Sequence, residues 1–506
     1  MKLKVKIINF ETGNIKIIVL NSEDAQKIGG KAGDRILLKN DGLESEKPLI
    51  AILDISYSDS IVAPGEIGVF LDTSKNYKIS EQLSIRLAEP PDSYKFINKK
   101  IKGNKLTTEE INRIISDAVS GHLSQIELAS FVTGVSINGM DKEEMISLSL
   151  AEARSGDIFN FESDVFDKHS TGGVPGNKVS LIIVPIVAAA GLNIPKTSTR
   201  AITSPSGTAD TMEVLAPVIF SSEELREIFR NEKACIVWGG SLDISPADNI
   251  LIEIERPLHM DPFALMIPSI LAKKLSMGVK KLVLDIPVGA KTKFPTIDDG
   301  KNFAYIFKDV AKSVGIQSEC ALTLAHQPIG HAVGPALEAR EALRLLMDYN
   351  AGPNSLIEKS TDLAGILLEM GGKAQKGDGQ RKAKEILRSG KAYDKMKQII
   401  KAQGGNPEIT PEEIIVGPYV KECYSLKSGH ITEVDNGIIN QIAKSAGCPF
   451  SKSSGIEIIK KQGARIAEGD LIFKIYSNSQ SKLKRAEKIY NQASPIILGG
   501  MMIERI

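Results

Sequence analysis

The sequence has few cysteines, no long hydrophobic run and no excess of charge of either sign, and each shortage narrows what the protein can be. The four cysteines among its 506 residues stand far apart, at Cys235, Cys320, Cys423 and Cys448. This spacing argues against a zinc ribbon and against a disulfide-stabilised fold, so we expect reduced thiols and no metal site. The longest apolar run, 181–192, is interrupted by Pro185 and is too short to cross a bilayer.

Positive and negative side chains are almost equal in number. Lysine and arginine count 63 and aspartate and glutamate 62, which gives a net charge of +1, and aromatic residues make up 5% of the chain. A nucleic-acid-binding protein would carry a basic surplus and aromatic side chains for stacking. Residues 1–6 alternate like a strand and lack the apolar block of a signal peptide. We therefore expect a cytoplasmic protein without nucleic-acid or membrane partners.

The alternation of strand and helix patterns predicts an α/β multidomain protein. The N-terminal part has the pattern of strands, including a hairpin over 2–20, and predicts a small β-barrel-like domain for assembly. Capping-box patterns beginning at Thr107, Ser124 and Asp141 predict a helical domain. A central α/β domain with a mixed or parallel sheet and a C-terminal α+β domain complete the chain. The predicted boundaries are 1–86 for the β-rich domain, 95–163 plus about 245–277 for the helical domain, 164–244 plus about 278–410 for the α/β domain, and 411–506 for the C-terminal domain.

Two polar loops carry the strongest functional signal, because common catalytic motifs are absent. The sequence has no P-loop, Rossmann, zincin or serine-hydrolase motif, which disfavours those enzyme classes. The first loop, Asp167–Ser180, combines lysines, hydroxyls and three glycines just before a predicted helix, which suits an anion such as phosphate. The second loop, Lys196–Asp210, is rich in serine and threonine around Arg200. Both loops would lie at carboxyl ends of strands, where open sheets bind ligands, although such loops are also often purely structural.

Four motifs in this order resemble the thymidine phosphorylase family of pyrimidine nucleoside phosphorylases. They are the DKHSTGG run 167–173, a Ser-x-Arg loop that ends in Gly-Thr-x-Asp at Asp210, Ser269–Lys274 and Val288–Ala290. Other features are similar to the archaeal branch of that family, the AMP phosphorylases. These are the additional N-terminal domain, Val-Pro-Gly in the first loop, Thr-Arg-Ala-Ile-Thr-Ser in the second, and Gly-Ala-Lys-Thr-Lys at 289–293. The resemblance covers nearly the whole chain.

The resemblance implies a pentosyltransferase with a helical and an α/β domain and a cleft that closes on substrate. Inorganic phosphate would attack C1′ of AMP, and also of CMP and UMP, to give the free base and ribose 1,5-bisphosphate in nucleotide salvage or degradation. Phosphate is then a co-substrate, and no cofactor is expected. We expect a homodimer, or a larger homo-oligomer that assembles through the N-terminal domain.

The same resemblance implies roles for individual residues. Asp261 corresponds to the proton donor of the archaeal branch, and His169 and Lys273 fall at the base site. Lys293, with Lys291 nearby, would neutralise the 5′-phosphate of the nucleotide. The residues at phosphate-binding positions are Lys168, Ser170, Ser180, Ser198 and Thr208. Those at AMP-binding positions are Gly173, Thr199, Arg200, Ala201, Ile202, Thr203, Ser204, Thr208, Ser269 and Lys293.

Two other functions fit parts of the sequence. One is a pyrimidine nucleoside phosphorylase, for thymidine or uridine, with an extra N-terminal domain. Against it, Ile254 stands where that branch has a base-holding arginine, and Arg256 is out of register. The other is an assembly or binding protein that kept the fold without the chemistry, which the intact motifs argue against. Without the resemblance, Asp261 before Pro262 would be a helix N-cap, and His169 would be a structural hydrogen-bonding residue.

Overall fold

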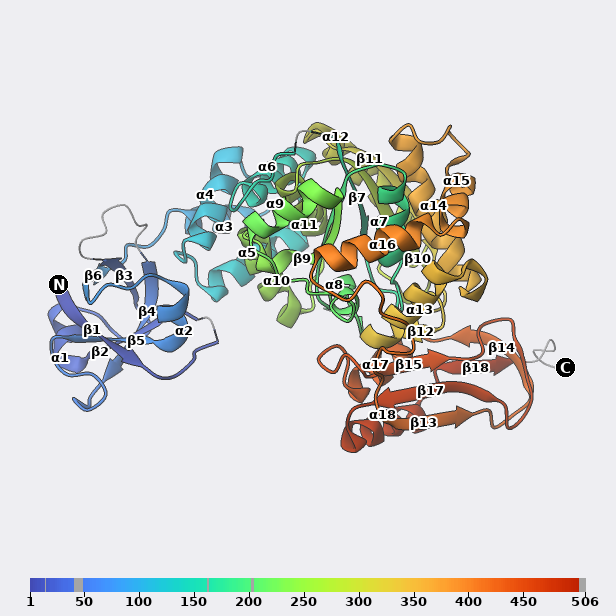
Figure 1. Cartoon of the computed structure of the whole chain (residues 1–506). Coiled ribbons are helices and arrows are strands. Elements are labelled where there is room, and N and C mark those ends of the chain that lie inside the picture. Colours follow the sequence, from blue (N-terminus) through green and yellow to red (C-terminus); the bar gives the residue numbers. More distant parts are fainter. Residues whose placement is uncertain (14, 41–48, 162, 202–203, 500–506) are drawn as a thin grey trace, which may run out of the picture. The chain divides into compact units, whose positions relative to one another are not determined.

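The chain forms two compact units. The computed structural model describes residues 1–506 apart from 14, 41–48, 162, 202–203 and 500–506. One unit comprises Met1–Ser155 and Pro246–Pro268, and the other comprises Gly156–Ser245 and Ser269–Ile506. Figure 1 shows the elements of both units in the colours of the sequence.

The first unit begins with a closed six-stranded barrel. Its elements are β1 (Lys2–Ile8), β2 (Ile17–Asn21), α1 (Ser22–Lys27), β3 (Arg35–Asn40), β4 (Leu49–Ser56), β5 (Glu66–Phe70), α2 (Leu71–Asn76) and β6 (Gln82–Leu87). The strand order is β1-β5-β2-β4-β3-β6. Because β5 pairs with β1 in parallel and with β2 antiparallel, the predicted hairpin over 2–20 is wrong. The segment 9–16 between β1 and β2 is longer than a tight hairpin loop, so a third strand can lie between them.

The rest of the first unit is a helical bundle. Its helices are α3 (Ser93–Ile101), α4 (Thr108–Val119), α5 (Gln125–Asn138), α6 (Lys142–Ala153) and α10 (Pro246–Leu258). The capping boxes predicted at Thr107, Ser124 and Asp141 are confirmed, with both reciprocal hydrogen bonds made at each. One apolar core joins α3–α6 to α10, because each helix contributes buried apolar residues to it. The segments 93–153 and 246–258 therefore form one bundle although they are distant in sequence.

The second unit contains a parallel sheet covered by helices. Its strands are β7 (Val165–Ser170), β8 (Ile194–Ser198), β9 (Ala234–Trp238), β10 (Val279–Val288) and β11 (Gln317–Leu324). Its helices are α7 (Ser180–Ala189), α8 (Thr208–Met212), α9 (Ser222–Glu232), η1 (Gly239–Ser241), α11 (Phe263–Ser276), which begins in the first unit, α12 (Ile297–Ser313), α13 (Pro335–Met347), η2 (Tyr349–Ala351), α14 (Asn354–Met370), α15 (Gly379–Arg388) and α16 (Lys391–Ala402). The orders are β11-β10-β7 and β8-β9, with a parallel bridge from Val165 to Asn193 between them. All of these pairings are parallel, so the strands end at one edge of the sheet.

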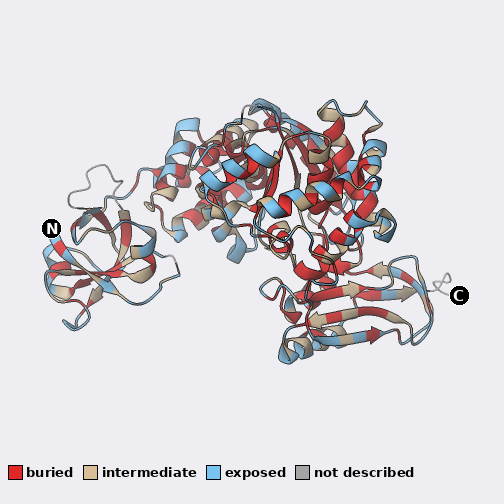
Figure 2. Cartoon of the chain, viewed as in Figure 1, coloured by how far each residue is buried: buried red, intermediate tan, exposed pale blue. Residues whose placement is uncertain are grey.

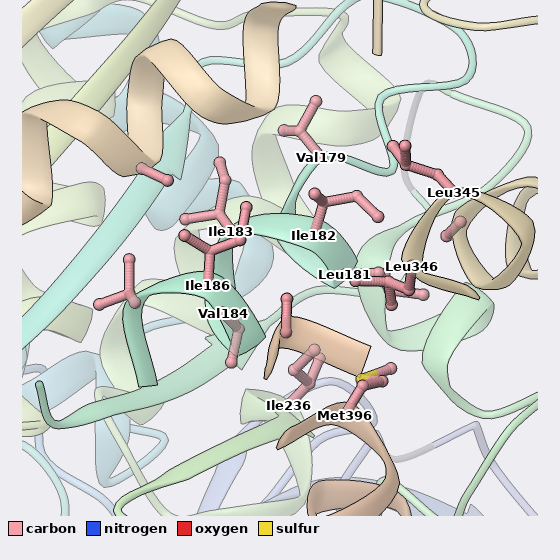
Figure 3. Close-up of a cluster of buried hydrophobic side chains, with 14 of the residues drawn as sticks. Val179, Leu181, Ile182, Ile183, Val184, Ile186, Ile236, Leu345, Leu346 and Met396 are labelled. Carbon is pink, nitrogen blue, oxygen red and sulfur yellow. The ribbon is translucent and has the colours of Figure 1, made fainter. Parts of the chain in front are cut away.

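Helix α7 lies at the centre of the largest apolar core. Its residues from Ser180 to Val187 are all buried. Figure 3 shows Leu181, Ile182, Ile183, Val184 and Ile186 among side chains that include Ile236, Leu345 and Met396. A helix that is apolar on every side must be surrounded by other elements. The first polar loop therefore leads into a helix that is fixed on all sides by the core.

The basic segment 373–406 folds as two amphipathic helices. Its basic and glycine-containing sequence alone would favour a solvated stretch. Apolar residues nevertheless recur at helical spacing, and α15 and α16 bury Ala383, Ile386, Met396 and Ile399 in the core around α7. Figure 2 shows the alternation of buried and exposed residues along both helices. The charged residues of such a helix lie on its exposed face. Whether the helix also has a buried face depends on the spacing of its apolar residues.

The C-terminal part of the second unit is an α+β domain. Its elements are β12 (Ala332–Val333), β13 (Tyr419–Tyr424), β14 (Gly429–Val434), α17 (Asn436–Ala446), β15 (Gly455–Ile458), β16 (Arg465–Ile466), β17 (Leu471–Ser477), α18 (Gln480–Gln492) and β18 (Ile496–Gly499). Strand β12 precedes α13 in the chain but pairs with β15, which ties the α/β domain to the C-terminal one. The predicted fold class is thus confirmed: a β-barrel, a helical bundle, an α/β domain and a C-terminal α+β domain.

Candidate active site

The first polar loop begins where β7 ends. Side chains alternate along a strand, so Lys168 and Ser170 point to one face of the sheet, and Asp167 and His169 point to the other. Beyond β7, a Cβ on Gly176 would lie 2.5 Å from the carbonyl oxygen of Ile329. Only glycine permits this approach, which pins the loop against the segment before β12.

Lys178 anchors this loop from inside the protein. Its ammonium donates to the carbonyls of Gly176, Ile329 and Ala332 at 2.8–3.1 Å and lies 2.7 Å from Glu341 Oε2. The side chain is fully buried. Of the two lysines in the loop, Lys178 therefore holds the backbone in place, and Lys168 is the one that remains for an anion.

We expect Lys178→Met to lower the free energy of unfolding by about 3–5 kcal/mol, because it leaves Glu341 and three carbonyls without their cation. Denaturant titration followed by circular dichroism measures this. The matched control is Lys308→Met, which breaks an exposed ion pair with Glu319. An exposed pair contributes at most about 1 kcal/mol to the free energy of unfolding. Equal losses in the two variants would contradict the anchoring role.

Two buried carboxylates organise the lysines of the site. On one face, Asp285 of β10 accepts from Ser170 Oγ at 2.8 Å and pairs with Lys168 and Lys359 at 3.6 and 3.0 Å. Burial lowers the pKa of Lys168 to about 8 although Asp285 opposes the shift. An ammonium this close to losing its proton gains from a second anion nearby.

On the other face, Asp167 pairs with Lys274 of α11 at 2.6 Å and with Lys196 of β8 at 3.5 Å. Burial lowers the pKa of Lys196 to about 7, against the attraction of Asp167. Between them, the two carboxylates gather four buried lysines, so this region carries more positive than negative charge. Such an excess favours the binding of an anionic substrate.

His169 is uncharged near neutral pH in this environment. Burial lowers its pKa well below 6.5, and the neighbouring Lys274, Lys196, Lys273 and Lys168 lower it further. A neutral imidazole has one donor and one acceptor nitrogen. It therefore suits hydrogen bonding to a nucleobase better than pairing with a phosphate.

The second polar loop is braced by carboxylates. Asp210 accepts from the backbone nitrogens of Ala201 and Gly207 at 2.7 and 2.9 Å. Arg200 makes a two-pronged contact with Glu213 at 2.6 and 2.8 Å and also bonds to Asp210, and its guanidinium stacks on Trp238. Hydrogen bonds to Glu213 chiefly raise the pKa of Arg200. Its charge is thus compensated within the loop, so the side chain braces the loop.

The turn after β10 lies beside the first loop. A Cβ on Gly173 would be 3.9 Å from the backbone nitrogen of Lys293, so these two residues are neighbours. Lys291 in the same turn pairs with Asp435 and, at 3.3 Å, with Glu433 of the C-terminal domain. The hydrogen bond to Asp435 raises the pKa of Lys291 more than any other contact. Lys291 therefore fastens the turn to the C-terminal domain.

The other predicted residues lie at the ends of the same elements. Ser198 ends β8 and donates to the Val237 carbonyl at 3.0 Å, while Ser180 and Thr208 begin α7 and α8. On α11, Lys273 donates to Ser269 at 3.2 Å. Because β7, β8 and β10 run parallel, the residues of the second unit gather at one edge of its sheet. Thr199 and Ser204 lie in the second loop, and Ile202 and Thr203 fall outside the described residues.

Asp261 belongs to the first unit and is exposed. The Pro262 carbonyl accepts from the nitrogens of Leu265 and Met266, so Pro262 occupies the cap position of α11 and Asp261 precedes it. The alternative of an N-cap at Asp261 is therefore disfavoured.

Sequence reasoning missed the partners that hold these side chains. Asp285 is the one charge in the buried part of β10, 282–288, and Lys359 is buried with the apolar residues of α14. A charged residue at an apolar position of a regular pattern is the signal that could have revealed both. Asp210 belongs to the Gly-Thr-x-Asp motif at the start of α8, where an acidic residue is ordinary. Glu213 directly follows α8 and interrupts no apolar pattern, so it gave no comparable signal.

The described residues contain neither a cluster of metal-binding side chains nor a helix that could span a membrane. Across the described residues, no group of three histidine, cysteine or acidic side chains is arranged to hold a metal ion. Within the same part of the chain, every helix is too short or too polar to span a bilayer.

Known proteins with similar sequences share this organisation. Residues 94–156 match the helical bundle domain of a glycosyl transferase family, and 162–393 match its a/b domain. Residues 430–496 match the pyrimidine nucleoside phosphorylase C-terminal domain. The AMP phosphorylases of Methanocaldococcus jannaschii and Thermococcus kodakarensis are each 44% identical to this chain, and that of Methanosarcina barkeri is 45% identical. Each match covers 100% of this chain and 99% of the relative.

A solved structure gives a weaker likeness. The crystal structure of anthranilate phosphoribosyltransferase (TrpD) from Thermus thermophilus is 19% identical and has a TM-score of 0.49. The match covers 61% of this chain and 98% of that one.

The fold and the domain matches together define a glycosyltransferase that transfers a pentosyl group. The full-length identities then specify the group within that class. This chain belongs to the AMP phosphorylase family, and the resemblance stated from its motifs is confirmed.

Proposed function

We propose that this protein cleaves AMP by phosphorolysis. An oxygen of inorganic phosphate forms a bond to C1′, and the C1′–N bond breaks with its electron pair leaving on adenine. The products are free adenine and ribose 1,5-bisphosphate. The observation that carries the proposal is the identity of about 44% to AMP phosphorylases over the whole chain. We also propose CMP and UMP as substrates.

The phosphate nucleophile would bind at the end of β7. We assign its contacts to Lys168, Ser170, Ser180, Ser198 and Thr208. The excess of buried lysines at the edge of the sheet supports this assignment, because it gives the region a net positive charge before any ligand arrives. Hydroxyls complete the coordination as neutral donors.

The nucleotide would lie next to the phosphate nucleophile. We assign its contacts to Gly173, Ser269, Lys293 and the second loop from Thr199 to Ser204 with Thr208. Because Arg200 is paired with Glu213, its part is to hold the loop, and we assign the charge that meets the 5′-phosphate to Lys293. Neutral His169, with Lys273, would contact the base.

Asp261 would protonate the departing base. Cleavage builds positive charge at C1′ and negative charge on the base, and a carboxylic acid that gives up its proton relieves the latter. The reaction needs no redox step and no group carrier, so we propose that it proceeds without a cofactor. Its substrates are nucleotides and phosphate, which leads us to place it in the cytoplasm.

Release of adenine from AMP tests this function. We expect release only when inorganic phosphate is added, with ribose 1,5-bisphosphate formed in equal amount, as followed by liquid chromatography. Thymidine or uridine turned over better than AMP would instead support the nucleoside phosphorylase. Binding of AMP without any turnover would support the binding protein.

We further propose that the N-terminal barrel serves assembly of a homo-oligomer. It has a closed apolar core of its own, and none of the proposed active-site residues lies in it. Deleting residues 1–85 is expected to reduce the mass of the oligomer, as measured by light scattering, and to leave a folded and active dimer. An unchanged mass would contradict an assembly role.

A further inference from the structure

Asp285 is surrounded by four donors although its carboxylate is completely buried. Ser170 and Thr323 donate to it at 2.8 and 2.6 Å. Lys359 and Lys168 lie 3.0 and 3.6 Å from its Oδ2. Two hydroxyls and two ammonium groups around one anion form the kind of environment that a bound phosphate also requires.

Two of these four donors are the side chains that we assign to the phosphate nucleophile. Ser170 Oγ already accepts from the Asn177 amide at 3.2 Å and from the Gly172 nitrogen at 3.4 Å. Its single proton is therefore directed at Asp285, and Lys168 is paired with the same carboxylate. For phosphate to bind, both groups must redirect a proton from Asp285 to a phosphate oxygen.

Lys359 is the donor that the phosphate assignment does not use. It projects from α14, is nine-tenths buried, and makes no well-aligned hydrogen bond to the described residues besides its ion pair with Asp285. Burying an ion pair is expensive, and removing one partner from it costs more. A carboxylate that lost Lys168 to phosphate would stay ionised only if another cation remained beside it.

We propose that Asp285 is an internal substitute for phosphate, and that Lys359 is a positioning residue that neutralises Asp285 once Lys168 and Ser170 turn to the substrate. In the empty site, the carboxylate keeps the two ligands gathered and charged. In the occupied site, Lys359 and Thr323 remain as its partners. This inference rests on the phosphate site of the proposed function.

The electrostatics of the cluster agree with this arrangement. Burial alone would raise the pKa of Asp285, but Lys359 first and Lys168 second lower it, to about 2 overall. Among the described residues, the charged groups paired with Asp285 are these two, from α14 and β7, and β11 contributes the uncharged Thr323. The larger effect thus comes from the lysine that stays with Asp285.

The first variant to test is Lys359→Met. We expect the KM for phosphate in AMP phosphorolysis to rise by about tenfold or more, with the KM for AMP nearly unchanged. Relative to the unmodified enzyme, the defect should shrink as the pH falls from about 8 to 6, because a protonated Asp285 needs no cation. Taking the ratio to the unmodified enzyme cancels the titration of phosphate.

The rescue variant is Asp285→Asn combined with Lys359→Met. An uncharged amide does not need Lys359, so the double variant should bind phosphate better than Lys359→Met alone. Asp285→Asn and the double variant should differ by less than about threefold in the KM for phosphate. This second comparison decides the question even if Lys359→Met alone does not fold.

The matched control is Lys100→Met. It breaks another buried pair, Lys100–Glu144 at 2.7 Å, in the helical bundle, and should leave the KM for phosphate unchanged. An unchanged KM in folded Lys359→Met, or a double variant no better than it, would overturn the inference. So would a tenfold difference between Asp285→Asn and the double variant.

Calorimetric titration of each variant with inorganic phosphate separates this inference from the proposed function. If the unmodified protein binds phosphate but releases no adenine, the proposed function fails while the order of phosphate affinities still tests Lys359. If adenine is released and the affinities do not follow the predicted order, only the inference fails.

Discussion

Replacing Asp261 with asparagine is expected to lower kcat for AMP phosphorolysis by about 10²–10⁴-fold, the usual span for loss of a general acid. Asparagine keeps the size and polarity of the side chain but has no proton to give to the departing base. The KM for AMP should change little, because the acid acts as the bond breaks. Steady-state kinetics with saturating phosphate measures both constants.

Glu253→Gln provides the control for the Asp261 variant. Glu253 is an exposed carboxylate on α10 in the same unit, so its neutralisation removes one negative charge without removing the proposed acid. We expect nearly normal kcat. Near-normal turnover by the Asp261 variant itself would remove this residue from the mechanism.

Replacing Lys293 with alanine is expected to raise the KM for AMP sharply and to reduce the preference for AMP over adenosine. A charge-assisted hydrogen bond to phosphate is worth about 1.5–3 kcal/mol, or roughly 10–150-fold in affinity. Adenosine lacks the 5′-phosphate, so its weaker turnover should be almost unaffected. Comparing kcat/KM for AMP and adenosine in the unmodified enzyme and the variant gives the interaction energy between Lys293 and the 5′-phosphate.

Lys291→Ala is the neighbouring comparison for Lys293. Its charge is already matched by Asp435 and Glu433, so its loss should loosen the turn and raise the KM for AMP less than the Lys293 variant does. If Lys293→Ala weakened adenosine and AMP equally, the residue would not meet the 5′-phosphate. Thymidine or adenosine turned over as well as AMP would favour the nucleoside phosphorylase.

Local rules predicted those features that depend on near neighbours in the chain. The capping boxes at Thr107, Ser124 and Asp141 need only a side chain and a backbone group three residues apart, and all three form. The same holds for the glycine-rich turn before α7. The hairpin prediction over 2–20 failed because strand pairing is a long-range choice, and β5 pairs with both partners.

The chemistry of the site was predictable only in part. The motif around Lys168 and Ser170 indicated a phosphate site and a family, because those residue types and glycines carry the signal in the sequence itself. The two lysines of that loop could not be distinguished from each other. Only the fold places Lys178 among three carbonyls and Lys168 beside Asp285, and it does so through residues more than a hundred positions away.

The sequence by itself determined the domain order, the family and the residue types of the phosphate and nucleotide loops, since composition, periodicity and motifs are properties of the chain. The tertiary structure alone decided which charges are already matched. Arg200 is matched by Glu213, Lys291 by Asp435, and Asp285 by Lys359. The reason is physical: the free energy of a charge depends on its burial and on partners within a few ångströms, and folding brings those partners together from distant parts of the sequence.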